Sequence, residues 1–309
     1  MKIERVLCVY RKSLYQIYVR EHQERSVKEA LRSGDAGAEA LRQSHEANEA
    51  ALKEVERVLR QFRLEAVVRW RAHLRNTHQF DLVISLGGDG TLLDTSHRVG
   101  DTPPLLGVNS DPEHSVGALC AGPVRELPAL IDGLLSGRLR PRRVMRMRAR
   151  VDGREVLGPI LNDALFANAC PAGLSRFDLV VLPAAGAEDS HSGHDGGAFR
   201  QHRGSGLWSS TPMGSTAAIR SAGGRPMPPG SRSLQYVVRE PYRPPGSSER
   251  IARRGSVPPG QTLVLVTRMR QGMLWADGAH RRLALGYSQQ VLIDRHPSDL
   301  QLVRPPRRP

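Results

Sequence analysis

Over residues 1–138, short apolar runs alternate with longer polar segments. Residues 23–62 repeat apolar side chains at three- and four-residue steps, which is typical of one helix face, and "SGDAGAE", Ser33–Glu39, should interrupt that helix because it holds two glycines. Val124–Gly137 predicts a further helix that ends at glycine. Strands that alternate with helices predict a parallel sheet in an α/β fold. The expected strands are Arg5–Tyr10, Leu64–Val68, Asp81–Leu86 and Pro104–Asn109.

After about Arg138 the pattern changes to short runs of strand propensity, separated by turns rich in glycine, proline and serine. This predicts a second, mostly β domain, so the fold class is α/β + β. We expect an α/β domain at 1–138, a mainly β domain at 139–295 and a C-terminal tail at 296–309. A return of the tail to the first domain is one option, and its end, "VRPPRRP", should fray. The runs are Val144–Val151, Gly158–Phe166, Arg176–Leu182, Leu234–Val238, Thr262–Thr267 and Gln290–Ile293.

The segment Pro183–Gly206 is rich in glycine, histidine and serine and should form a loop. His191, His194 and His202 raise the alternative of a metal site. A solvated loop is the preferred interpretation, because no cysteine or paired carboxylate spacing supports metal ligation.

The charge of the chain suggests an anionic partner. The 309 residues carry a formal net charge of +14, and the excess is mostly arginine, whose planar fork matches phosphate and carboxylate groups. The alternative is a GC-rich genome that encodes its basic residues as arginine. Nucleic acid is not the expected partner, because aromatic residues, on which bases would stack, make up only 5%.

The three cysteines, Cys8, Cys120 and Cys170, lie far apart and form no CxxC pair. This disfavours a disulfide framework or a structural zinc site and suits a reducing compartment. The first residues enter a predicted strand almost at once, without the apolar stretch of a signal peptide, and no run of apolar residues is long enough to span a membrane. We therefore expect a cytoplasmic protein without membrane contacts.

The clearest chemical signal is "GGDGT", Gly87–Thr91, which follows the apolar run ending at Leu86. Ligands bind at the carboxyl ends of parallel strands, and glycines leave backbone N–H groups open to phosphate oxygens. A carboxylate there needs another task, so Asp89 is expected to accept a proton from an attacking hydroxyl or to hold Mg²⁺. The alternative is a tight strand-to-helix turn with Asp89 as N-cap. The motif favours phosphoryl transfer.

Two further blocks accompany this motif: "LNDALFANA", Leu161–Ala169, and "GSGLWSSTPMGSTAAIRSAGG", Gly204–Gly224. GGDGT resembles the signature of NAD kinases and diacylglycerol kinases, and the other two blocks resemble the Asn-acidic pair and the TPxGSTA block of NAD kinases. The resemblance covers about Leu82–Gly224. It implies an N-terminal α/β domain, a C-terminal β domain and a dinucleotide in the cleft between them.

The resemblance also implies residue roles. Asp89 matches the family's general base, with Gly90 beside it against the dinucleotide, while Asn162 and Asp163 match the pair that contacts the adenosine part. A turn between strands is the alternative for that pair. Further positions expected to bind the dinucleotide are Ser205, Thr216, Ala217 and Ser221. Positions expected to bind nucleotide phosphates are Gly87, Gly88, Thr91, Asn109, Thr211, Gly214 and Ser215. Among the arginines, Arg220 is a candidate phosphate ligand and equally a surface cation.

Details resemble the plant NADH kinase branch, including Asp-Pro in "GVNSDPEHSVGALCAG", Gly107–Gly122. Typical NAD kinases carry Asp where this chain has Ser205, and Tyr where it has Ala218. The family's Asp lies near the nicotinamide-side ribose, so its loss should change the selectivity between cationic NAD⁺ and neutral NADH.

The resemblance implies an ATP-dependent kinase that phosphorylates the adenosine-ribose 2′-hydroxyl of NADH or NAD⁺, with Mg²⁺ arriving on ATP and no metal site of its own. Polyphosphate is the alternative donor, and a homo-oligomer is expected. One rival is a GGDGT lipid kinase, which should lack the two later blocks and show an apolar membrane-facing patch. The other is a non-catalytic dinucleotide sensor, which would bind without turnover.

Overall fold

The chain forms two compact units in a computed structural model that describes residues 2–184, 199–242 and 253–304. One unit comprises Met1–Arg143 with Leu300–Pro309, and the other comprises Val144–Asp299. The second unit is thus inserted into the sequence of the first, and the two are described separately below. The segment 305–309, which holds most of the predicted frayed tail, lies outside the described residues.

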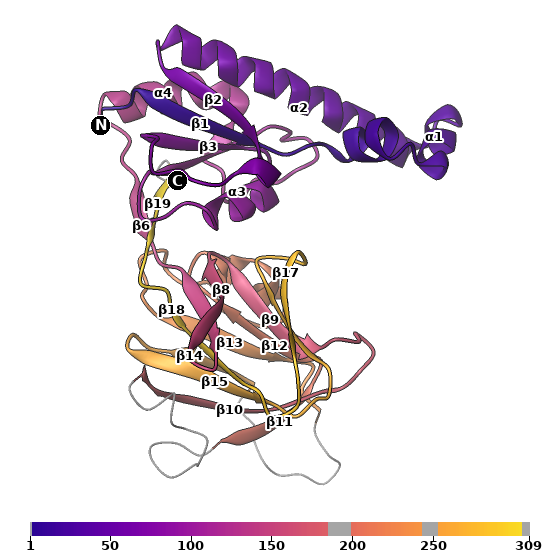
Figure 1. The fold of residues 1–309 in the computed structure, drawn as a ribbon, viewed down its shortest axis with the longest axis vertical. Coiled ribbons are helices and arrows are strands. Elements are labelled where there is room, and N and C mark those ends of the chain that lie inside the picture. Colours follow the sequence, from indigo (N-terminus) through magenta and orange to yellow (C-terminus); the bar gives the residue numbers. More distant parts are fainter. Residues whose placement is uncertain (1, 185–198, 243–252, 305–309) are drawn as a thin grey trace. The chain divides into compact units, whose positions relative to one another are not determined.

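The first unit is built on a parallel sheet with the strand order β2-β1-β3-β4-β19-β6, and β5 pairs with β4 (Figure 1). The two central strands, β3 and β4, are buried along their whole length, which explains their unbroken apolar runs. The C-terminal segment contributes a strand, since Leu302 and Val303 pair with Leu105 and Leu106. The bounds are β1 Arg5–Tyr10, β2 Glu65–Trp70, β3 Leu82–Leu86, β4 Leu105–Asn109, β5 Gly122–Pro123, β6 Arg142–Val144 and β19 Leu300–Val303.

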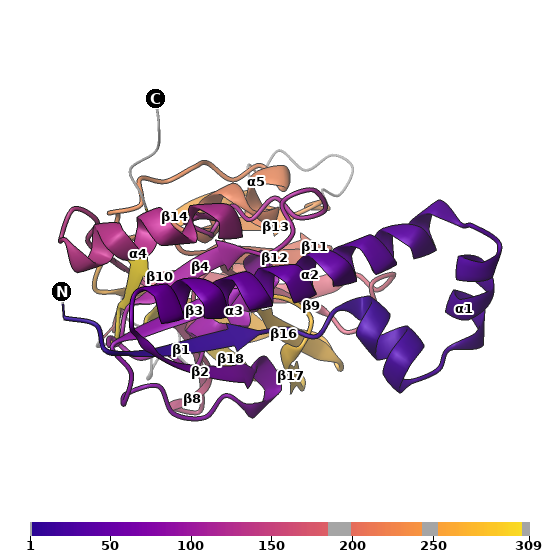
Figure 2. The same ribbon diagram turned by 90° about the horizontal axis from the view of Figure 1, so that it is seen from above.

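Helices cover both faces of this sheet. The apolar sides of α2 and α4 join alternate side chains of β1, β3 and β4 in one core, and Figure 2 shows α2 crossing this face of the sheet. On the opposite face lies α3, where Leu92 lies over Gly107 (Figure 1). The predicted interruption of the long helix is confirmed: α1 ends at Arg32, and Asp35 caps α2 by accepting the Ala38 N–H at 2.9 Å. The bounds are η1 Gln16–Glu21, α1 Arg25–Arg32, α2 Ala36–Gln61, η2 Arg71–His73, α3 Asp89–Ser96, η3 Val124–Glu126 and α4 Leu127–Leu135.

The second unit consists of two antiparallel sheets in its described residues, with strand orders β11-β10-β15-β18-β7-β8 and β14-β13-β12-β9-β16-β17. One apolar cluster draws side chains from both sheets, and Phe166 and Phe177 meet edge to face at 5.4 Å within it. The bounds are β7 Met147–Val151, β8 Arg154–Ile160, β9 Asp163–Asn168, β10 Ser175–Pro183, β11 Arg200–Gly204, β12 Gly206–Ser210, η6 Gly214–Thr216, α5 Ala218–Ser221, β13 Leu234–Arg239, β14 Arg254–Val257, β15 Gln261–Thr267, β16 Gly272–Ala276, β17 Arg281–Leu285 and β18 Gln290–Arg295.

The predicted α/β + β fold class is confirmed, but two details of the sequence analysis are wrong. The run Gly158–Phe166 is not one strand, because the chain turns at Leu161 and Asn162 between β8 and β9. His202 is not solvated: it is buried in β11 and stacks on Phe177 at 5.5 Å, and burial, followed by the nearby Arg200 charge, lowers its pKa. His191 and His194 lie outside the described residues.

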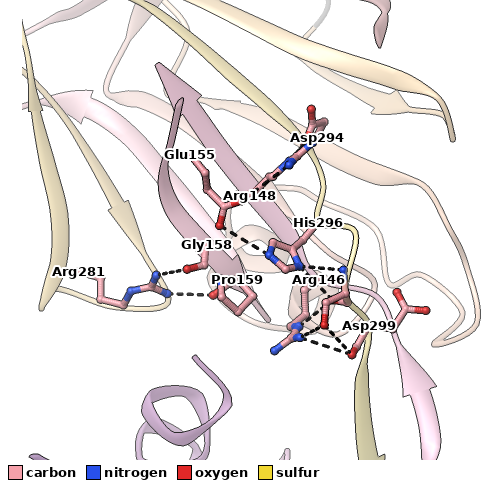
Figure 3. A network of polar contacts seen from close by, with 10 residues as sticks. Arg146, Arg148, Glu155, Gly158, Pro159, Arg281, Asp294, His296 and Asp299 are labelled. Atoms are coloured by element: carbon pink, nitrogen blue, oxygen red, sulfur yellow. Dashed lines mark hydrogen bonds and ion pairs between the residues drawn. The ribbon is translucent and has the colours of Figure 1, made fainter. Parts of the chain in front are cut away.

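A polar network joins the beginning and the end of the second unit (Figure 3). Arg146, only 1% exposed, donates from Nε to the Ser298 carbonyl at 3.1 Å and from Nη2 to Ser298 Oγ at 2.8 Å. Asp294 of β18 accepts from Arg148 and Arg150 of β7 at 2.7 Å each. Buried carbonyls without a donor are costly, so these bonds fix the two points where the chain enters and leaves the unit.

Among the described residues, no helix is long and apolar enough to cross a membrane.

Candidate active site

The GGDGT segment forms the turn from β3 into α3. Gly87 has φ +149°, and a Cβ there would lie 2.4 Å from Thr91 Oγ1, while a Cβ at Gly88 would lie 2.3 Å from Ser115 Oγ. Gly87 is therefore required by the turn itself, and a side chain at Gly88 would have to displace the Ser115 hydroxyl. Gly90 differs: it is exposed, and a Cβ there would meet no atom within 4 Å. Space beside Gly90 is thus open to a ligand.

Asp89 is the first residue of α3, and the N-cap position belongs to Gly88. Its half-buried carboxylate accepts the Ala118 N–H at Oδ2, 2.9 Å, and the Leu119 N–H at Oδ1, 2.7 Å. Asp89 therefore does not act as a side-chain cap, which was the alternative interpretation. Each oxygen has a second lone pair, so the oriented carboxylate can still accept a proton or a cation.

The segment that holds Asp89 is itself held by Asn109, at the end of β4. The buried Asn109 side chain donates from Nδ2 to the Ser115 carbonyl at 2.8 Å and accepts the Asp111 N–H at Oδ1, 3.1 Å. Gly117, with φ +60°, completes the turn against this carboxamide. Asn109 thus shapes the loop, and its expected contact with nucleotide stays a prediction. The same holds for Thr91, whose buried Oγ1 has no hydrogen-bond partner in the described part of the chain.

In the second unit, Asp277 fixes the Asn162–Asp163 turn. Its carboxylate accepts three backbone N–H groups, from Leu161 and Asn162 at 2.7 Å and from Asp163 at 3.2 Å. This explains why the chain bends between β8 and β9. The sequence analysis missed Asp277; the available signal was "DG" between two strand-like runs, which predicts a turn.

The TPMGST segment packs directly on this turn. Thr211 donates its N–H to the Asn162 carbonyl at 2.9 Å, and a Cβ at Gly214 would lie 2.1 Å from the same oxygen. Two hydroxyls serve the loop itself: Thr211 bonds to the Leu161 carbonyl, and Ser215 bonds to the Pro212 carbonyl at 2.7 Å. Their expected roles in phosphate binding stay predictions.

Several groups around this turn have hydrogen-bonding capacity that the described part of the chain does not use. Asn162 Oδ1 is buried without a hydrogen-bond partner in the described residues. Thr216 and Ser221 are exposed and Ala217 is half-buried. A carboxamide oxygen, two hydroxyls and an adjacent carboxyl group suit the hydroxyls and base edge of a nucleoside.

Asp163 is a buried carboxyl group beside a second one. Burial, followed by the charge of Asp277, raises the pKa of Asp163 to about 7. Near neutral pH a substantial fraction of Asp163 is protonated, so this carboxyl group can donate as well as accept a hydrogen bond.

Ser205 lies away from the Asn162 turn. It precedes β12, whereas Ser210 at the other end of β12 pairs with Asp163. Five residue steps at roughly 3.4 Å each separate the two positions by about 17 Å. The structure therefore brings together most of the predicted residues in two groups, around Asp89 in one unit and around Asn162 in the other, and places Ser205 apart from the second group.

Among the described residues, no three or more His, Cys, Asp or Glu side chains group as a metal site would require.

A glycine-rich strand end with an oriented carboxylate defines a nucleotide-dependent phosphotransferase of the GGDGT type. Residues 1–137 match the family model for the ATP-NAD kinase N-terminal domain. A probable NADH kinase of Oryza sativa is 35% identical over 243 residues, which are 74% of this chain and 72% of that protein. An NADH kinase of Arabidopsis thaliana is 36% identical over 197 residues, which are 57% of this chain and 60% of that protein. The chain belongs to the NAD kinase family.

Solved structures show the same fold at low identity. An NAD kinase from Archaeoglobus fulgidus in complex with ATP matches with a TM-score of 0.66 and 16% identity over 97% of this chain and 93% of that one. Yeast NADH kinase complexed with NADH matches with a TM-score of 0.65 and 16% identity over 99% of this chain and 85% of that one.

Gly90→Ala tests whether the open space at Gly90 is used by substrate. The new methyl group meets no protein atom, and alanine is favoured in helices, so the free energy of unfolding should stay equal or rise by up to about 1 kcal/mol. A clash with bound substrate of about 1–3 kcal/mol should lower kcat/KM by roughly tenfold to a hundredfold. The control is Gly87→Ala, which should destabilise the fold. Unchanged kinetics in Gly90→Ala would contradict the assignment.

The raised pKa of Asp163 predicts a pH-dependent stability. Because the folded state holds the proton to about pH 7 and the unfolded state only to 3.8, the free energy of unfolding should fall as pH rises between these values. The steepest slope is about 1.4 kcal/mol per pH unit. Denaturant titrations of the wild type and Asp163→Asn should differ in this slope, whereas Asp152→Asn, at an exposed site, should keep it. An equal slope in Asp163→Asn would refute the assignment.

Proposed function

We propose that this protein transfers the γ-phosphoryl group of ATP to the 2′-hydroxyl of the adenosine ribose of NADH or NAD⁺, giving NADPH or NADP⁺. The observation that carries the proposal is the Asp89 carboxylate, oriented by the Ala118 and Leu119 N–H groups at the end of β3, beside the open Gly90. The names of the plant relatives support the choice of acceptor.

Asp89 acts as the general base. It takes the proton of the 2′-hydroxyl as the ribose oxygen forms a bond to the γ-phosphorus, while the bond from that phosphorus to the bridging oxygen breaks and ADP leaves. Catalysis of this kind consists mostly of positioning and charge neutralisation. The hydrogen bonds from the Ala118 and Leu119 N–H groups hold the carboxylate in one orientation, and the remaining lone pair can accept the proton.

Mg²⁺ enters with ATP as part of the substrate and offsets the phosphate charge. Protein-bound Mg²⁺ commonly keeps waters and phosphate oxygens and takes only one or two carboxylates. Asp89 is the carboxylate at this strand end that could contribute one ligand, so the residues present fit a metal carried by the phosphates.

The groups around Asn162 recognise the adenosine part. The buried, unpartnered Asn162 Oδ1 would accept a hydrogen bond from a ribose hydroxyl or an amino group, and Asp163 can donate or accept one. Thr216, Ala217 and Ser221 supply the accessible side of the same surface. A dinucleotide that satisfies Asn162 relieves the cost of a buried polar atom without a partner, which favours binding.

We propose further that NADH is preferred over NAD⁺. Ser205 is neutral where typical family members carry a carboxylate, so it offers no charge to the cationic nicotinamide ring of NAD⁺. The nicotinamide ring of NADH is neutral, so the absence of a carboxylate at position 205 removes no charge attraction to it.

Asp89→Asn is the direct test of the proposed function. Removal of a general base lowers turnover by about 10²–10⁴-fold. NADPH formation from MgATP and NADH should fall by this factor, measured at a temperature at which the variant is folded. Asparagine offers one acceptor oxygen for the two N–H groups of Ala118 and Leu119, so the thermal unfolding midpoint should also fall. Asp101→Asn, an exposed aspartate of the same unit, is the control. Full turnover in Asp89→Asn would refute the role of the base, and binding without any product in the wild type would favour a dinucleotide sensor.

Ser205→Asp tests the selectivity. One exposed charge interaction contributes up to about 1 kcal/mol, so the ratio of kcat/KM for NAD⁺ to that for NADH should rise up to about fivefold. Ser205→Asn introduces a side chain of the same shape as aspartate but without its charge, so it should leave the ratio near the wild-type value. An unchanged ratio in Ser205→Asp would show that Ser205 does not set the preference.

A further inference from the structure

The register of the parallel sheet places two arginines beside the GGDGT turn. Tyr10 of β1 pairs with Trp70 of β2 and with Leu86 of β3. The next residue on each strand is therefore Arg71, Arg11 and Gly87, in this order across the carboxyl edge of the sheet. Neighbouring strands lie about 4.8 Å apart, so the Arg11 backbone borders the phosphate-binding turn directly.

Three cations occupy this edge, and two of them have acidic partners. Lys12 pairs with Glu21 at 2.7 Å, and Arg71 pairs with Asp94 of α3. Arg11 is half-buried, its side chain makes no hydrogen bond or ion pair in the part of the chain that the structure describes, and its Nε is buried without an acceptor.

The surroundings of Arg11 disfavour its charge. Burial, followed by repulsion from Arg71, lowers the pKa of Arg11, whereas Asp111 acts in the opposite direction. The Asp111 carboxylate is already bonded to His114 at 2.9 Å. A buried charge without a partner costs stability, and a bound anion would remove this cost.

We propose that Arg11 binds a phosphate group of the nucleotide substrates, with Arg71 adding positive charge beside it. The guanidinium fork matches two phosphate oxygens, and the carboxyl edge of a parallel sheet is where such ligands bind. The phosphate belongs either to the triphosphate of ATP or to the pyrophosphate of the dinucleotide. This inference rests on the proposed function, but phosphate binding can be measured without turnover.

The test compares Arg11→Met and Arg11→Lys with the wild type. The probes are inorganic tripolyphosphate, MgATP and NADH, and the readouts are the thermal unfolding midpoint and the KM of each substrate. Arg60→Met, at an exposed position of α2 in the same unit, removes the same charge and should behave as wild type.

Arg11→Met should unfold at the same or a higher temperature than wild type without ligand, because a half-buried charge without a partner is gone. It should lose the stabilisation by tripolyphosphate. Hydrogen bonds to charged groups contribute about 1.5–3 kcal/mol, so the KM of one substrate should rise roughly tenfold to a hundredfold. A rise for ATP assigns the triphosphate, and a rise for NADH assigns the pyrophosphate. Arg11→Lys should retain part of the binding.

Two results would overturn the proposal. One is an Arg11→Met protein that keeps wild-type stabilisation by tripolyphosphate and both wild-type KM values. The other is a wild type that none of the three probes stabilises. If Arg11→Met fails to fold, the same binding measurements on Arg11→Lys test the proposal, because lysine keeps the charge but lacks the two parallel N–H donors of the guanidinium group. Failure of the proposed function would instead show as phosphate binding without product.

Discussion

A carboxylate that accepts backbone N–H groups fixes the irregular backbone at the candidate site residues of each unit. In the α/β unit, Asp89 accepts the N–H groups of Ala118 and Leu119, and in the β unit, Asp277 accepts those of Leu161, Asn162 and Asp163. Charged hydrogen bonds of this kind are stronger than neutral ones. They hold irregular backbone in one conformation where no regular sheet or helix could.

The two carboxylates differ in what they leave free. Asp277 accepts three backbone N–H groups and serves as a structural anchor, and its neighbours Asn162 and Asp163 are the groups that we propose contact the ligand. Asp89 accepts one N–H at each oxygen and stands beside Gly90, where no side chain fills the space. The same kind of interaction therefore fixes the turn at Asn162 in one unit and orients the carboxylate that we propose as the general base in the other.

Much of this was predictable from local patterns. The apolar run Arg5–Tyr10 forms β1 with the expected bounds, and GGDGT follows a buried strand as its composition predicted. The predictions that were wrong concern features that contacts between distant parts of the sequence determine. A turn at Asn162 and Asp163 was the alternative that the sequence offered, but the carboxylate that fixes it, Asp277, is more than a hundred residues away in sequence and was missed. His202 likewise looked like a loop residue, since its aromatic partner Phe177 comes from another strand.

For the glycines and arginines, too, the sequence alone does not show which individual residues matter to the site. The sequence presents Gly87, Gly88 and Gly90 as equivalent, whereas the structure separates two glycines with side chains close by, Gly87 and Gly88, from Gly90, beside which the space is open. It presents a general excess of arginine, whereas strand register singles out Arg11 at the edge of the sheet. Composition reports how many charges exist, and only tertiary pairing reports which of them lacks a partner.

The central claim is that a phosphoryl group moves from ATP to the adenosine ribose. The most direct measurement is phosphorus NMR of the products after the purified protein has been incubated with MgATP and NADH. The account predicts ADP and a new 2′-phosphate monoester on the dinucleotide in equal amounts. Folded protein that forms no such monoester, or that places the phosphate on another acceptor, would contradict it.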